Sequence, residues 1–153
     1  GLKTAISYFY PDLDRRLNID SVRDLLKVAK KRGVEISIEN VPEPFPFLLK
    51  SVEDFSRFFA ELGEDLGLTL DVGHANINHQ TNDFMSKFRS RIIHVHASDN
   101  EGTSDTHRGI GQGTVEWRSV ADSLKRTKYN RIIMLESIEH IEESIQTLQN
   151  LLT

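Results

Sequence analysis

Four short apolar segments of the chain each end in a residue that can bind a metal ion, and this recurrence constrains the fold most. The four residues are Glu39, Asp71, His96 and Glu136, and each directly follows a run of mostly apolar side chains. Stretches with helical spacing of apolar residues separate the segments. Strands that alternate with helices predict βαβ units, a parallel sheet and right-handed crossovers. Because the carboxyl ends of parallel strands lie on one side of such a fold, the four side chains are expected to meet.

The predicted elements follow one another without a linker-like or low-complexity stretch between them. A single domain over residues 1–153 is therefore expected, at a length typical of one domain. Strands are predicted over five segments: 2–9, 34–39, 68–71, 91–96 and 131–136.

The predicted helices carry their apolar residues at helical spacing. The first has a stripe from Ile19 to Ala29, with Asp20 as its expected N-cap and Gly33 just past its end. The second opens at Ser51 with a capping box. After the strand that ends at residue 71, a loop and a short helix around 83–88 are expected. The last two helices are predicted from apolar residues that include Trp117, Val120 and Leu124, and Ile138, Ile141, Ile145, Leu148 and Leu151.

The alternation of side chains along the strands separates a closed barrel from an open sheet. Residues of equal parity share one face of a strand. The polar parity contains Ser37 and Glu39, Thr69 and Asp71, and His94 and His96. The opposite parity is apolar and is expected to pack under helices; it contains Val34, Ile36, Ile38, Leu68, Leu70, Ile93 and Val95. One apolar face and one polar face favour a barrel with a polar lumen.

The four strand-end residues form a mixed set of oxygen and nitrogen ligands. Three carboxylates (Glu39, Asp71 and Glu136) and the imidazole of His96 suit Mn²⁺, Mg²⁺, Co²⁺ or Zn²⁺, with little discrimination among them. The alternative is that these residues end their strands and face solvent without binding an ion.

Composition excludes several classes of site and leaves others unfavoured. The chain has no cysteine, so disulfides, zinc-thiolate sites and cysteine nucleophiles are excluded. Its net charge of −4 offers no broad basic field for a phosphate backbone, which disfavours a nucleic-acid partner. No apolar run reaches the ~20 residues of a membrane helix, and no leader opens the chain. A cytoplasmic location without a membrane partner is therefore expected.

Five segments together resemble the xylose-isomerase-like barrel superfamily, which contains sugar isomerases and epimerases and endonuclease-IV-type DNA repair enzymes. The segments are 38–42 (IENVP), 70–76 (LDVGHAN), 94–100 (HVHASDN), 105–113 (DTHRGIGQG) and 135–136 (LE). The resemblance implies that the five predicted strands are the fourth to eighth of a (β/α)₈ TIM barrel, which typically takes ~250 residues. The chain is then expected to be the carboxyl-terminal part of a barrel that lacks its amino-terminal strands.

The resemblance also implies roles for particular residues. Glu39, Asp71, His96 and Glu136 match the first metal site of the family. Glu39 and Glu136 match its catalytic glutamates, which transfer a proton beside a sugar carbonyl through a metal-stabilised enediolate; metal binding without proton transfer is the alternative. His74, Asp105 and His107 match a second metal site of the endonuclease branch, and they are candidates for a second ion or for substrate contacts. Arg108 is a candidate to neutralise an anionic group of the substrate.

The leading hypothesis is a divalent-metal-dependent isomerase or epimerase of a sugar or sugar phosphate, an activity expected of the full-length protein and not necessarily of the fragment alone. The rival enzyme hypothesis is endonuclease-IV-like cleavage of DNA at abasic sites. It is weakened because the first predicted strand shows no histidine where that branch would place one. A third hypothesis is a non-catalytic remnant or interaction domain that retains metal ligands. Because a partial barrel leaves two open edges, self-association through those edges is also expected.

Overall fold

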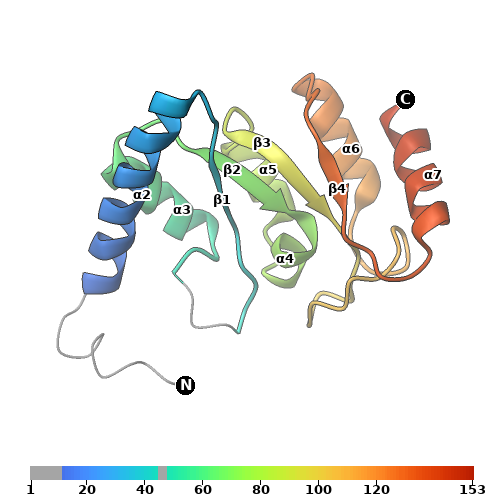
Figure 1. Ribbon diagram of the computed structural model, residues 1–153. Coiled ribbons are helices and arrows are strands. Elements are labelled where there is room, and N and C mark those ends of the chain that lie inside the picture. The colour runs from blue at the N-terminus through green and yellow to red at the C-terminus, as the bar shows by residue number, and fades with distance from the viewer. Residues whose placement is uncertain (1–11, 45–47) are drawn as a thin grey trace.

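The computed structural model describes residues 12–44 and 48–153, which form one parallel sheet with helices packed on it (Figure 1). The sheet has four strands in the order β1-β2-β3-β4, and all neighbours are parallel. The strands are β1 (Ser37–Glu39), β2 (Gly67–Asp71), β3 (Ile92–Ala97) and β4 (Ile133–Leu135). The α/β fold and the parallel sheet predicted from the sequence are therefore confirmed. The predicted strand at 2–9 lies outside the described residues.

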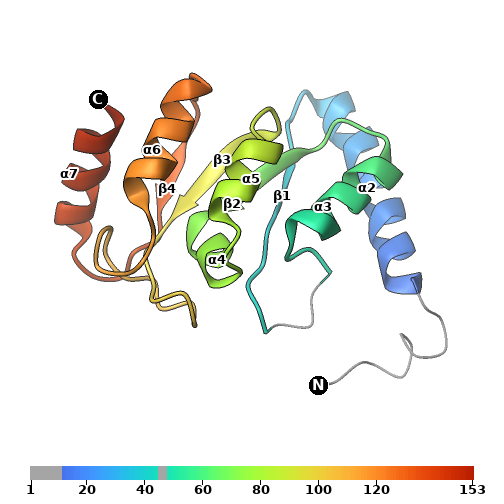
Figure 2. The same ribbon diagram turned by 180° about the vertical axis from the view of Figure 1, so that it is seen from behind.

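The helices gather on one face of the sheet. Figure 1 shows the strands in front of helices α3 to α6, and Figure 2 shows the same helices in front of the strands after a half turn. Among the described residues, no helix covers the opposite face. The helices are α2 (Leu13–Arg32), α3 (Val52–Leu62), α4 (Val72–Ile77), α5 (Thr81–Lys87), α6 (Trp117–Arg126) and α7 (Ile141–Leu152).

The core lies between the covered face of the sheet and these helices. Leu68, Leu70 and Val95 point into it from the strands and are at most 1% exposed. Phenylalanine rings from α3, α5 and the residue that follows α5 meet above them, with centroid separations of 5.5–6.1 Å and tilted or edge-on geometry. Such pairs add to the stabilisation that comes from burial alone. The rings belong to Phe55, Phe59, Phe84 and Phe88.

Helix boundaries differ from the sequence predictions at three places. Helix α2 begins at Leu13, so Asp20 lies inside it and the prediction of Asp20 as N-cap was wrong. No glycine or proline between residues 13 and 20 interrupts the helical hydrogen bonds, so the helix extends past Asp20. The predicted end at Gly33 is confirmed, since this residue adopts a positive φ of 64°. The capping box at Ser51 is confirmed too, because Ser51 Oγ accepts from the amide of Asp54.

The other two differences concern α4 and α7. The loop predicted after Asp71 contains helix α4, whose first turn Asp71 caps through its side chain. Helix α7 begins at Ile141, so the prediction that Ile138 belongs to it was wrong; Ile138 precedes the helix and is 77% exposed. Helical spacing cannot mark the first turn of a helix, because a residue just before it continues the same pattern.

A bulge in β3 changes the assignment of one strand residue. Leu68 pairs with Ile92, but Thr69 pairs with His94, so the register skips Ile93. Ile92 rather than Ile93 is buried in the core, and the prediction for Ile93 was wrong. The side chain of Ile93 instead lies over Gly67, where an added Cβ would collide with it. Beyond the bulge the predicted alternation resumes.

Both edge strands lie beside exposed apolar side chains. Leu17, Leu25, Val28 and Val34, in α2 and just after it, are each more than half exposed. At the other end of the sheet, the exposed residues are Ile132, Met134, Ile138, Ile141 and Ile145. None of the helices described at 12–44 and 48–153 combines the length and the apolar character that crossing a bilayer requires.

Candidate functional site

The structure brings the four strand-end residues together at the carboxyl edge of the sheet. His96, on β3, is the centre of the group. Its Nδ1 lies 3.3 Å from Oε1 of Glu39, 3.2 Å from Oε1 of Glu136 and 3.8 Å from Oδ2 of Asp71. Because Glu39 ends β1 and Glu136 follows β4, the group draws on all four described strands. We call these four residues the strand-end cluster.

Polar side chains also lie one layer below the strand-end cluster. The ring of His94 packs edge-on against that of His96, with centroids 5.1 Å apart. On the neighbouring strands, the hydroxyls of Ser37 and Thr69 share a hydrogen bond of 2.6 Å. These residues support the cluster from below, on the face that the sequence alternation assigned to a polar lumen.

Asp71 is the most buried member of the strand-end cluster, with 0% of its surface exposed. Its Oδ1 accepts the amide of His74 at 2.7 Å, which caps α4. Its Oδ2 is buried and has no hydrogen-bond partner within the described part of the chain. Burial raises the pKa of the Asp71 carboxyl to about 6, and the nearby charges of Glu39 and Glu136 act in the same direction. A buried carboxylate oxygen without a partner, beside three other ligand-capable side chains, fits a divalent cation.

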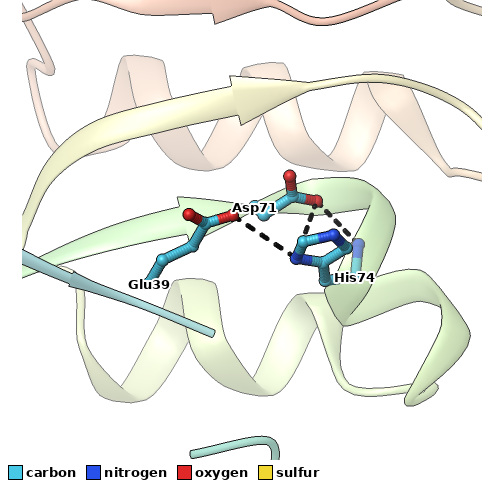
Figure 3. Close-up of side chains that lie close together, drawn as sticks. All are labelled: Glu39, Asp71 and His74. Carbon is cyan, nitrogen blue, oxygen red and sulfur yellow. Dashed lines mark hydrogen bonds and ion pairs between the residues drawn. The ribbon is translucent and has the colours of Figure 1, made fainter. Parts of the chain in front are cut away.

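His74, in the first turn of α4, faces the carboxylates of Glu39 and Asp71, with its Nδ1 3.5 Å from Oε1 of Glu39 and 3.8 Å from Oδ1 of Asp71 (Figure 3). Its Nδ1 lies 2.8 Å from the carbonyl oxygen of Asn40, which can only accept, so Nδ1 carries a hydrogen. Its Nε2 lies 3.2 Å from Oδ2 of Asp105. Burial by itself would lower the pKa of His74, but the charge of Asp71, the Asn40 carbonyl and Asp105 outweigh it and raise the pKa.

Asp105 and His107 form a second cluster with His74. Nε2 of His107 lies 3.1 Å from Oδ2 of Asp105, the same oxygen that faces His74. Nδ1 of His107 faces the carbonyl oxygen of Glu136 at 3.1 Å, so this ring is also protonated at Nδ1. Two Nε2 atoms therefore converge on one carboxylate, whose Oδ1 is buried and has no partner among the described residues.

Arg108 is not brought into either cluster. Its guanidinium pairs with Glu101 and donates to the carbonyl oxygen of Gln112 at 3.0 Å. These contacts hold the guanidinium within the loop between β3 and α6, so the structure does not support the suggestion that Arg108 binds an anionic group at the site.

The sequence reasoning overlooked two buried residues that shape the site. Asp99 is fully buried after β3 and accepts from the indole of Trp117 at 2.9 Å and from the amides of Gly111 and Val115. These bonds fix the loop that carries Asp105 and His107. Asn40, directly after Glu39, is also fully buried. Both residues lie in segments that carry the family resemblance, 38–42 and 94–100, but no role was assigned to either from the sequence.

Comparison with known proteins identifies the family. Residues 6–152 match the family described as "Xylose isomerase-like TIM barrel", and the chain belongs to it. Its four parallel strands and their helices are therefore part of a (β/α)₈ barrel, as the sequence resemblance implied.

Two uncharacterized proteins of Methanocaldococcus jannaschii are similar to the chain. MJ1614 is 32% identical over 94% of this chain and 57% of its own length. MJ1311 is 30% identical over 85% of this chain and 45% of its own length. The chain thus spans about half the length of the curated relatives that it matches.

Two solved structures at more than a quarter identity share the fold. A D-tagatose 3-epimerase-like protein is 28% identical with a TM-score of 0.82, over 94% of this chain and 57% of that one. The TTHB071 protein from Thermus thermophilus, soaked with ZnCl₂, is 26% identical with a TM-score of 0.65, over 91% of this chain and 53% of that one.

Proposed function

We propose that the chain carries the active site of a divalent-metal-dependent epimerase or isomerase that acts on a sugar or sugar phosphate. The observation that carries this proposal is the pair Glu39 and Glu136, whose Oε1 atoms lie 3.3 and 3.2 Å from the same nitrogen of His96. The D-tagatose 3-epimerase-like protein, similar over almost the whole chain, supports a sugar as the substrate class.

The strand-end cluster would hold one ion of Mn²⁺, Co²⁺, Zn²⁺ or Mg²⁺ through Glu39, Asp71, His96 and Glu136. When bound, such an ion stabilises negative charge that develops on substrate oxygens. The unpartnered Oδ2 of Asp71 and the zinc soak of the TTHB071 protein support this assignment.

Glu39 and Glu136 would move the proton. They enter the site from β1 and from the end of β4, the two ends of the described sheet, so a sugar bound between them presents one face to each. One carboxylate removes the proton from the carbon beside the carbonyl, and the other returns a proton from the opposite side, which inverts that carbon. General acid–base catalysis of this kind typically contributes 10²–10⁴-fold to a rate.

The second cluster gives a further role to His74, Asp105 and His107. Either a second cation or the hydroxyls of the substrate would satisfy the converging Nε2 atoms and the free oxygen of Asp105. A second cation beside the first would also suit cleavage of a phosphodiester. Cutting of DNA at abasic sites is therefore retained as the second candidate function, and it is supported by this cluster alone.

Exchange of a carbon-bound proton tests the two candidates together. With Mn²⁺ in D₂O, a ketose such as D-tagatose should lose the NMR signal of the proton beside its carbonyl. The exchange should vanish in Glu136→Gln, which keeps the shape but loses the base, and should persist in Glu142→Gln on the exposed surface of α7. Cleavage of an abasic duplex without any sugar exchange would favour the second candidate over the first.

Self-association would cover the exposed apolar residues at the two edges of the sheet, such as Val28 beside β1 and Ile132 beside β4. Removing an exposed apolar area from water is favourable in proportion to that area. Sedimentation over a dilution series should then show a dimer or larger species. A compact monomer at micromolar concentration would contradict this part of the proposal.

A further inference from the structure

The side chain of Asn40 extends the pairing of β1 with β2 beyond the last backbone pair, at the carboxyl edge of the sheet. The last backbone pair between β1 and β2 joins Glu39 and Thr69. Beyond it, Asn40 Nδ2 donates to the carbonyl oxygen of Asp71 at 2.9 Å, and the amide of Asp71 donates to Asn40 Oδ1 at 2.8 Å. Both bonds are buried, where hydrogen bonds are strongest and a missing partner is most costly.

These two bonds fix the main chain of Asp71 and so the direction of its side chain. The carboxylate is held again at Oδ1 by the amide of His74. With the backbone clamped on one side and Oδ1 on the other, Oδ2 has little freedom and faces the strand-end cluster, 3.8 Å from Nδ1 of His96. Asp71 is therefore held at its amide, its carbonyl oxygen and Oδ1, so its side chain loses little entropy when Oδ2 binds an ion.

The main chain of Asn40 orients a second site residue. Its carbonyl oxygen accepts the Nδ1 hydrogen of His74 at 2.8 Å, which leaves Nε2 facing Asp105. One residue therefore holds Asp71 through its side chain and His74 through its backbone. A displaced Asn40 would disturb both clusters at once.

We infer that Asn40 is a positioning residue, which acts through Asp71 to set the geometry and the affinity of the cation site. This inference rests on one part of the proposed function, namely that the strand-end cluster binds a divalent ion. Outer partners of metal ligands commonly change affinity by about 10–100-fold when they are removed. The same size of effect is expected here, without any contact between Asn40 and the ion or the substrate.

Asn78 offers a matched control, because its side-chain amide also bonds to the main chain. Nδ2 donates to the carbonyl oxygens of Val41 and Lys50, at 3.1 and 3.0 Å, and Oδ1 accepts from the amide of Glu43 at 2.9 Å. These bonds hold the loop after β1 and involve no member of either cluster. Substitution of either asparagine should therefore lower stability, but only substitution of Asn40 should change the cation site.

The test compares Asn40→Leu, which keeps the volume but loses both bonds, with Asn78→Leu. Asn40→Ala and Asn78→Ala repeat the comparison in case the branched side chain is not accommodated. Mn²⁺ binding is measured by calorimetry, and the visible spectrum of bound Co²⁺ reports the number and geometry of its ligands. Thermal unfolding of the same metal-free samples measures the purely structural cost.

Asn40 variants should bind Mn²⁺ about 10–100-fold more weakly and show an altered Co²⁺ spectrum. Asn78 variants should lose thermal stability but keep the wild-type spectrum and an affinity within about twofold, because they leave Asp71 in place. Unchanged Mn²⁺ affinity and an unchanged Co²⁺ spectrum in folded Asn40 variants would overturn this inference but not the proposed function. Equal losses of Mn²⁺ affinity in the Asn40 and Asn78 variants would do the same. Absence of any Mn²⁺ binding to the wild-type chain would instead overturn the metal dependence of the proposed function, and this inference with it.

Discussion

The helix-covered face of the sheet and the carboxyl ends of its strands differ in whether their buried groups have the partners they need. On the helix-covered side, Phe55 and Phe84 are fully buried among other rings, and their groups need no polar partner. At the strand ends and in the loop after β3, buried oxygens of Asp71 and Asp105 have no hydrogen-bond partner among the described residues. Packed apolar cores stabilise a fold, whereas unpaired buried polar groups destabilise it. Sites where a sequence breaks the rules that stabilise its fold are where function is expected.

The largest change in stability should come from a substitution in the core on the helix-covered face of the sheet. Phe55→Ala removes a ring that is in contact with three other phenylalanines and should lower the free energy of unfolding by about 3–5 kcal/mol. Urea unfolding of metal-free protein measures this loss. A loss below about 1 kcal/mol would show that the helix-covered face of the sheet is not a close-packed core.

A substitution of Asp71, at the end of β2, should instead raise the free energy of unfolding of the metal-free protein. Asp71→Asn keeps an N-cap for α4, since asparagine caps as well as aspartate, but removes a buried carboxylate. Because burial raises the pKa of Asp71 to about 6, ionising it at pH 8 costs stability. The metal-free variant should therefore gain up to about 3 kcal/mol at pH 8 and should lose Mn²⁺ binding. A metal-free variant less stable than wild type at pH 8 would show that the ionised Asp71 carboxylate stabilises the metal-free fold.

The same buried carboxylate should also make stability depend on pH. The folded pKa of Asp71 is raised, from an ordinary 3.8 to about 6, so its contribution is fully present below pH 3.8 and is lost as pH rises through about 6. His74, whose folded pKa is also raised, loses its contribution as pH rises above its ordinary 6.5. The stability of wild type relative to Asp71→Asn, in EDTA, should therefore fall between about pH 4 and 7.

Added Mn²⁺ should reverse that trend. Because cations compete with protons for these ligands, the rise in melting temperature caused by Mn²⁺ should grow from pH 5 to pH 8. Thermal scans with EDTA or Mn²⁺ at several pH values provide both measurements. A rise that shrinks with increasing pH would be inconsistent with binding through Asp71 and His96.

Patterns with a short period made much of the fold predictable from the sequence. Strand segments that alternate with helical spacing predicted the parallel sheet. The positions of Glu39, Asp71, His96 and Glu136 at strand ends predicted that these four side chains lie close together. Neither pattern carries information about a local insertion, so the bulge at Ile93 was missed. The early start of α2 was missed because Asp20 was taken as its N-cap, whereas the helix begins at Leu13.

The parts of the site that could not be predicted depend on contacts between distant segments. Asn40 meets Asp71 only when β1 and β2 lie side by side, and Asp99 meets Trp117 only when the loop after β3 folds back. The spacing of His74, Asp105 and His107 along the chain gave no indication that two of them would face one oxygen of the third. Residue types at strand ends thus indicate what a site can bind, while its geometry comes from tertiary structure.

Calorimetric titration of metal-stripped protein with Mn²⁺ tests whether the strand-end cluster is the metal site. The variants are Glu39→Ala combined with Glu136→Ala and, as the control, Glu53→Ala combined with Glu142→Ala, two exposed glutamates on α3 and α7. If the strand-end cluster is the metal site, wild type and control should bind about one ion per chain, and the Glu39 and Glu136 double variant should bind none at the same concentration. Undiminished Mn²⁺ binding by that double variant would contradict the assignment of the site.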